Sequence, residues 1–75
     1  MPTITLIGIG SSVHVSDHEG EERYTIVGSE DSDVTAGRIS ADSPLGRALL
    51  GHGAGDEVPV RTPGGLRRIT VLGVD

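Results

Sequence analysis

The sequence contains no cysteine, lysine, phenylalanine or tryptophan, and Tyr24 is its one aromatic residue. Without cysteine, the chain can form neither a disulfide nor a thiolate metal site. One tyrosine is too few aromatic side chains to line an aromatic ligand pocket. The longest apolar runs are far shorter than the roughly 20 residues that a membrane helix needs. These absences exclude a disulfide-stapled fold, a thiolate metal centre and a helix that spans a bilayer.

The length of 75 residues, with 12 glycines and 35% hydrophobic residues, bounds the fold. It allows one domain at most and lies near the lower limit for a core that folds without covalent staples. The start, Met1-Pro2-Thr3, lacks the basic segment of a signal peptide. We therefore expect one small, turn-rich globular domain in the cytoplasm.

The net charge of −5 argues against general binding to a nucleic-acid backbone, which requires clustered cations. The charge is unevenly distributed. Seven acidic residues lie between Asp17 and Asp33 against the single Arg23, whereas Arg61, Arg67 and Arg68 lie near the end. Two interpretations are open: a solvated surface, or a patch that faces a partner and steers its approach.

The clearest local signal is a short helix after Ser43. The Ser43 hydroxyl can cap a free amide of the first turn, and Pro44 fits the first helical position because its missing N–H is not needed there. Apolar residues then recur on one helical face, at Leu45, Ala48 and Leu49. Gly51 suits the left-handed residue that ends a helix. The predicted helix has about seven residues, so it must be stabilised by packing on a sheet.

Alternating apolar residues predict strands on both sides of this helix. The predicted strands cover residues 12–16, 23–28, 38–40, 57–62 and 66–74. A turn at 17–20 predicts a hairpin of the first two strands, and Pro63-Gly64-Gly65 predicts a tight turn between the last two. Residues 28–37 are expected to form a polar, acidic loop. The pattern indicates an α+β domain with about five short antiparallel strands and one short helix.

Five short blocks, in order and at matching spacing, resemble the C-terminal domain of the bacterial transcript-cleavage factors GreA and GreB. The blocks are Ile39-Ser40, Ser43-Pro44-Leu45, Arg47-Ala48-Leu49-Leu50-Gly51, Gly55-Asp56 and Thr62-Pro63-Gly64-Gly65. The resemblance extends from about Gly8 to Asp75 and implies an FKBP-like fold, a curved sheet around one short helix. It divides the chain into residues 1–10, a linker end and strand entry, and residues 11–75, an RNA-polymerase-binding domain.

The resemblance also implies a binding function. In that family the C-terminal domain docks on a coiled coil of the polymerase β′ subunit, at the rim of the secondary channel, and the segment that opens the helix is central to docking. The residues carried over are Asp42, Ser43, Pro44, Leu45 and Arg47. From the residues alone, a complement to the helix dipole is the favoured explanation of Asp42, and Ser43 has a sufficient role as a helix cap. We expect an anchor that is a monomer, has no cofactor and makes no sequence-specific contact to nucleic acid.

Catalysis is not expected. Factors of this family promote cleavage through acidic residues at the tip of an N-terminal helical hairpin, and no residue before 38 belongs to a predicted long helix. The acids between Asp17 and Asp33 are therefore not assigned that role. His14 and His18, with Asp17 nearby, are conceivable metal ligands, but strand and turn spacing does not gather them on one face. Serines such as Ser11 and Ser12 have no recognisable partners for a nucleophilic triad.

Gly8-Ile9-Gly10 is not a dinucleotide fingerprint, because the third glycine and the βαβ unit are missing. A glycine-rich strand entry or bulge explains it better. Two other functions are open beside the polymerase anchor. One is a free-standing Rnk-like or Gre-like regulator that competes for the same polymerase site. The other is a small prolyl isomerase or chaperone, which the scarcity of aromatic residues disfavours.

Overall fold

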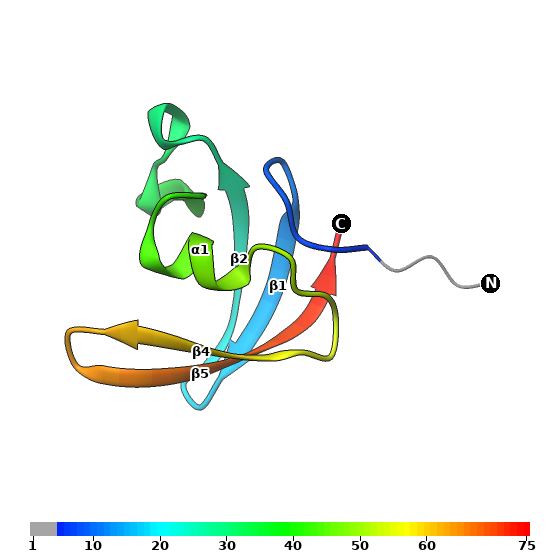
Figure 1. Ribbon diagram of the computed structural model, residues 1–75, viewed down its shortest axis with the longest axis vertical. Helices are drawn as coiled ribbons and strands as arrows, with labels where there is room; N and C mark the ends of the chain where they lie inside the picture. The colour runs from blue at the N-terminus through cyan, green and yellow to red at the C-terminus, as the bar shows by residue number, and fades with distance from the viewer. Residues whose placement is uncertain (1–4) are drawn as a thin grey trace.

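The computed structural model describes residues 5–75. Five strands pair in the order β3-β2-β1-β5-β4, and one helix packs on the sheet (Figure 1). The elements in chain order are β1 (Ser12–Asp17), β2 (Gly20–Val27), the 3-10 turns η1 (Ser29–Asp31) and η2 (Val34–Ala36), β3 (Arg38–Ser40), α1 (Pro44–Leu49), β4 (Glu57–Thr62) and β5 (Gly65–Val74). In the described part of the chain, no helix is long and apolar enough to cross a membrane.

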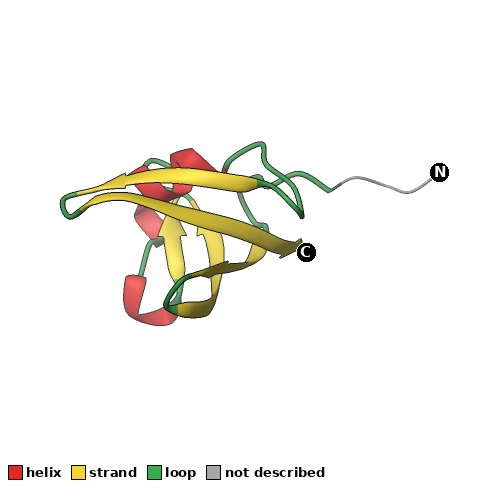
Figure 2. Ribbon diagram, turned by 90° about the horizontal axis from the view of Figure 1, so that it is seen from below, coloured by secondary structure: helices red, strands yellow, loops and turns green. Residues whose placement is uncertain are grey.

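The sheet curls strongly, so that its two halves form the walls of a half-barrel (Figure 2). One wall is the long β4–β5 hairpin, and the other consists of β1 and β2 with the short β3 at its edge. Helix α1 lies in the concave side, in contact with β3 and β4. This curvature leaves the start of the helix facing the end of the β4–β5 hairpin.

The predicted strand pattern is confirmed where apolar residues alternate. Val13 and Val15 of β1 are buried, and so are Val58 and Val60 of β4. The β1–β2 and β4–β5 pairs are antiparallel hairpins, as the turn residues predict. Strand β2 starts three residues earlier than predicted, at Gly20, because pairing with β1 continues to the turn.

The sheet differs from the expected antiparallel arrangement at β3. Strands β2 and β3 pair in parallel, with Ile26 opposite Ile39, so the sheet is mixed. The physical reason is the connecting loop, residues 28–37. Its two 3-10 turns carry the chain back to the level of Thr25 before β3 begins, whereas a tight turn would have reversed the strand direction.

The core consists entirely of aliphatic side chains. Its buried members among the described residues are Ile7, Val13, Val15, Ile26, Ile39, Ala41, Leu49, Val58, Val60, Ile69 and Val71. Leu49 is fully buried, so the predicted apolar face of the helix is confirmed. Tyr24 lies at the margin of this core, partly buried.

The segment before β1 is attached to the end of the helix. The Ile7 amide donates to the His52 carbonyl (2.8 Å), and the Gly51 amide donates to the Ile7 carbonyl (2.9 Å). Gly8 and Ser11 close a turn around Gly10, which has a φ of +95°. Because Ile7 is only 4% exposed, this segment packs as part of the core. The division between residues 1–10 and 11–75 stays a prediction, and residues 1–4 lie outside the described chain.

Helix α1 has six residues, one fewer than expected, and begins where the sequence predicts. Pro44 is the first helical residue, after the Ser43 cap. Gly51 follows the helix with a φ of +82°, as predicted for its terminator. Its amide, however, bonds to Ile7 and not to a helix carbonyl. The end of the helix is therefore fixed by a tertiary contact.

Candidate functional site

The start of α1 is held by a dense set of hydrogen bonds. The Ser43 hydroxyl donates to the Ser40 carbonyl (2.7 Å) and accepts from the Gly46 amide (3.0 Å). The Ser43 amide also donates to the Ser40 carbonyl (3.0 Å), and the Asp42 amide donates to the Ser40 hydroxyl (3.0 Å). The turn from Ser40 to Ser43 and the first turn of the helix thus form one rigid unit.

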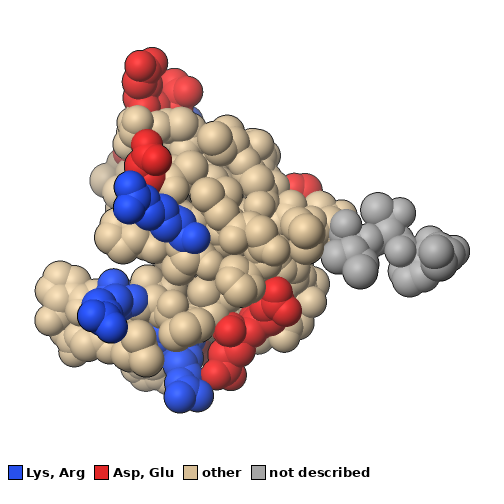
Figure 3. Space-filling view, viewed as in Figure 1, with Lys and Arg blue, Asp and Glu red and all other residues tan. Residues whose placement is uncertain are grey.

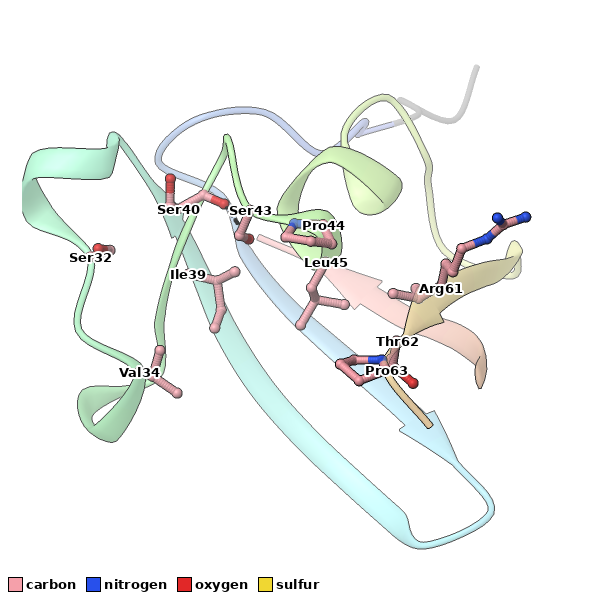
Figure 4. A pocket seen from close by; sticks show the side chains of 11 residues that line it. Ser32, Val34, Ile39, Ser40, Ser43, Pro44, Leu45, Arg61, Thr62 and Pro63 are labelled. Carbon is pink, nitrogen blue, oxygen red and sulfur yellow. Dashed lines mark hydrogen bonds between the residues drawn. The ribbon is translucent and has the colours of Figure 1, made fainter. Parts of the chain in front are cut away.

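An open groove of about 370 Å³ lies between this unit, the acidic loop and the end of the β4–β5 hairpin (Figure 4). Its lining residues are Ser32, Val34, Ile39, Ser40, Ser43, Pro44, Leu45, Val60, Arg61, Thr62 and Pro63. Figure 4 shows Ile39, Leu45 and Pro63 around a common space, with Val34 on the loop side. In the space-filling view, the surface is hollowed between the hairpin and the body of the domain (Figure 3).

The groove presents hydrocarbon to solvent. The three serine hydroxyls that line it are engaged within the domain: Ser32 donates to the Ser29 carbonyl (3.0 Å), and Ser40 and Ser43 belong to the turn before the helix. Val34, a groove residue of the loop, is 76% exposed although it is apolar. A concave surface of this kind is suited to an apolar side chain of a partner.

The site residues predicted from the sequence fall into two groups. Ser43, Pro44 and Leu45 line the groove. Asp42 and Arg47 do not line it, and both are exposed beside the start and the last turn of the helix. The structure therefore brings three of the five residues to one cavity and leaves the other two on its surroundings.

Sequence reasoning missed the two facing walls of the groove. Val34 comes from the acidic loop, and Val60, Thr62 and Pro63 come from β4 and the hairpin turn. Val34 carried a signal, because it is the one large apolar residue in an otherwise polar loop. The hairpin residues carried none, because their proximity to the helix depends on the curl of the sheet.

Several charged side chains on the segments that contribute to the groove have no ion pair among the described residues. Glu30 and Asp31 lie in the loop next to Ser32, and Asp42 lies next to Ser43; none of the three has an ion pair among residues 5–75. On the hairpin side, Arg61 is likewise without one. By contrast, Asp33 is 3.6 Å from Arg38, so that pair is satisfied within the loop.

The conceivable metal ligands do not converge. His14 lies 3.2 Å from Glu21, and His18 lies 3.8 Å from Glu19. Asp17 instead accepts from the Arg67 guanidinium, which is the main reason that its pKa lies below the ordinary value. In the described residues, no three His, Asp or Glu side chains are placed to hold a metal ion. The groove lining contains no aromatic side chain.

Comparison with known proteins identifies the family. Residues 2–75 match the model of the family described as "Transcription elongation factor, GreA/GreB, C-term". The chain is 43% identical over 72 residues to the transcription elongation factor GreA of Methylobacterium sp. (strain 4-46), covering 93% of this chain and 46% of that protein. It is 45% identical over 71 residues to GreA of Caulobacter vibrioides (strain NA1000 / CB15N), covering 92% and 45%. The chain thus spans about half the length of these relatives.

Solved structures agree in fold. The crystal structure of Thermus aquaticus Gfh1 superposes with a TM-score of 0.86 at 33% identity, covering 96% of this chain and 49% of that one. A prokaryotic transcription elongation factor GreA/GreB from Nitrosomonas europaea gives a TM-score of 0.75 at 32% identity, covering 99% and 62%. The chain belongs to the GreA/GreB family of bacterial transcription elongation factors, and it corresponds to their C-terminal domain.

Proposed function

We propose that this domain binds RNA polymerase and anchors a Gre-type factor at the rim of the secondary channel, with no catalysis of its own. The proposed contact is the groove beside α1, and its partner is the β′ coiled coil. The single observation that carries the proposal is that the helix-opening segment, Ser43 to Leu45, forms one wall of an exposed apolar groove.

The physical argument rests on the rigidity of that segment. Ser40, Ser43 and Gly46 are joined by hydrogen bonds of 2.7–3.0 Å, so the wall is already in place before a partner arrives. A preorganised surface loses little conformational entropy on binding. Leu45 is partly buried and Pro44 is exposed, so an apolar side chain of the partner would cover surface that is now in water. In this function the domain acts as a monomer in the cytoplasm.

Binding to purified bacterial RNA polymerase core, measured by interferometry, tests the proposal. A peptide of the β′ rim coiled coil is the competitor. We expect saturable binding that the peptide abolishes. Leu45→Asp should reduce affinity at least tenfold, because it buries a carboxylate in the groove without a partner. Asp42→Lys and Pro44→Ala should also weaken binding. Thr70→Val, on a strand away from the groove lining, is the control and should bind like the wild type.

A competition assay separates anchoring from catalysis. An excess of this domain should slow transcript cleavage by a full-length cleavage factor and should not stimulate cleavage when added alone. Failure of the domain to bind polymerase at any concentration would contradict the proposal. Binding that Leu45→Asp and the coiled-coil peptide leave unchanged would place the contact elsewhere on the domain.

A further inference from the structure

An ion pair joins the two walls of the half-barrel at one end of the sheet. Asp17, the last residue of β1, accepts a hydrogen bond from the guanidinium of Arg67 in β5. Because side chains alternate along a strand, Asp17 shares a face of β1 with the buried Val15. Arg67 shares a face of β5 with the buried Ile69 for the same reason. Both charged groups therefore lie on the concave side, at the margin of the core.

Beyond this point the β4–β5 hairpin loses the support of β1. Strand β5 pairs with β1 only from Val74 to Thr70, which lies opposite Ser16. Residues 58–69, which we call the hairpin end, form a two-stranded ribbon that pairs with no third strand in the described chain. Figure 1 shows this end projecting from the body of the domain. A two-stranded ribbon is only marginally stable alone, so its position depends on side-chain contacts.

The hairpin end supplies one wall of the groove, and Arg67 anchors it at the level where that wall begins. The wall consists of Val60, Arg61, Thr62 and Pro63. Arg67 lies directly opposite Val60 in the hairpin. Its partner Asp17 is itself fixed, because the second carboxylate oxygen accepts from the Glu19 amide (2.8 Å). The Asp17 side chain is 9% exposed, so water and salt screen this pair less than a pair on the open surface.

We propose that the Asp17–Arg67 pair sets the width of the groove at which the partner binds, by holding the hairpin end at a fixed distance from the start of α1. Arg67 does not line the groove, so it is a positioning residue that acts through the wall it holds. Without the pair, the groove has the required width for only a fraction of the time. The affinity then falls by that fraction. This inference rests on the proposed function, because it takes the polymerase as the partner.

Apolar packing also restrains the hairpin end. Val58 and Val60 are buried, and β4 contacts α1. Such packing is non-directional, so it favours contact without defining one separation between the hairpin and the helix. A charge-assisted hydrogen bond has a preferred distance and angle. The ion pair therefore supplies the restraint on position that the valines do not supply.

A distance measurement across the groove tests the proposal directly. The chain has no cysteine, so two spin labels can be attached at introduced cysteines. Gly28→Cys, just after β2, and Gly64→Cys, in the hairpin turn, are suitable. Neither glycine has a positive φ, and a β-carbon meets nothing within 4 Å at Gly28 and only the Thr62 hydroxyl, at 3.9 Å, at Gly64. Double electron–electron resonance then gives the distribution of label separations.

We expect one narrow distribution for the otherwise unchanged chain. Arg67→Gln and Asp17→Asn should each broaden it and extend it to longer separations. The matched control is Arg68→Gln, because Arg68 pairs with Glu57 (3.2 Å) inside the same hairpin and tethers it to no other element. The control should leave the distribution unchanged.

Binding to RNA polymerase core shows whether the partner requires that width. Arg67→Gln and Asp17→Asn should each weaken binding about fivefold, chiefly through slower association, because fewer molecules have the competent groove. Arg67→Lys keeps the cation and should recover most of the affinity. The double variant should lose no more than either single variant, as expected for two members of one pair. Thermal melts check that every variant is folded at the temperature of measurement.

The outcomes separate this inference from the proposed function. Unchanged label separations in Arg67→Gln and Asp17→Asn would overturn the inference, because packing alone would then hold the hairpin end. Weaker binding of Arg67→Gln beside normal binding of Asp17→Asn would also overturn it, because Arg67 would then contact the partner directly. Broader separations with unchanged affinity would mean that the partner needs no fixed width, which again overturns it. If the wild type does not bind, the proposed function fails, and the label separations alone decide whether the pair sets the width.

Discussion

A β-carbon at position 46 would stand 2.1 Å from the carbonyl oxygen of Ser40. Gly46 is thus the point where α1 crosses the end of β3 with no room for a side chain. The contact is to backbone, which cannot swing aside as the end of a long side chain can. Glycine at this position is needed for close packing, although it costs helix propensity.

Gly46→Ala should therefore destabilise the domain, although alanine favours a helix by about 1 kcal/mol in an exposed position. We expect a net loss of about 1–3 kcal/mol from overpacking. For a domain of this size, each kcal/mol lowers the melting temperature by about 4–8 °C. Gly73→Ala is the control, because a β-carbon there meets nothing within 4 Å. Equal melting temperatures for the two variants would contradict the close approach.

The Ser43 cap makes a second prediction about stability. Ser43→Ala removes the acceptor of the Gly46 amide and the donor to the Ser40 carbonyl, and should cost about 1 kcal/mol. Ser43→Thr keeps both hydrogen bonds and should recover most of the loss. Denaturant unfolding of the three proteins provides the measurement. A Ser43→Ala variant as stable as the wild type would mean that the cap does not hold the helix.

The Asp17–Arg67 pair predicts a pH dependence of folding. The Arg67 hydrogen bond, followed by the Glu19 amide (2.8 Å), lowers the pKa of Asp17 below its ordinary value of 3.8. A carboxyl with a lowered folded-state pKa stabilises the fold above the unfolded-state pKa, and this stabilisation disappears as the pH falls through the folded-state pKa. The stability advantage of the wild type over Asp17→Asn should therefore be largest near neutral pH and shrink below about pH 4.

Thermal melts of both proteins between about pH 3 and about pH 7 measure that difference. Glu30→Gln is the control, since Glu30 has no ion pair among the described residues. If the melting temperatures of wild type and Asp17→Asn differ by the same amount at every pH, ionisation of Asp17 beside Arg67 does not stabilise the folded state.

Pro59 is expected to keep the open edge of the sheet from pairing with another chain. Strand β4 is an edge strand, and proline has no N–H to offer to another chain. Pro59→Val restores that donor and adds strand propensity, so we expect the variant to self-associate at high concentration. Sedimentation velocity measures the association.

Thr70→Val is the matched control for the edge experiment. It adds a similar apolar group to β5, whose two sides already pair with β1 and β4. It should therefore sediment as the wild type does. A Pro59→Val variant that remains monomeric together with this control would show that the proline does not protect the edge.

Local physics explains what the sequence determined by itself. The Ser43 cap, Pro44 and the Gly51 terminator specify a helix through contacts within a few residues, and the structure has that helix. Alternating valines specify β1 and β4, and Pro63-Gly64 specifies the turn between β4 and β5. Both are local signals, because side-chain alternation and turn conformation depend on neighbouring residues. The family blocks act in the same way, since they mark turns and caps.

Tertiary structure alone decided the remaining features. The parallel pairing of β3, the attachment of Ile7 to Gly51 and the requirement for Gly46 each depend on the meeting of segments that do not direct each other locally. The groove is the clearest case. The family resemblance named Leu45 as a site residue, but Val60 and Pro63 join it only because the sheet curls and brings the hairpin across the start of α1. Local propensities fix the pieces, and non-local packing fixes which surfaces face each other.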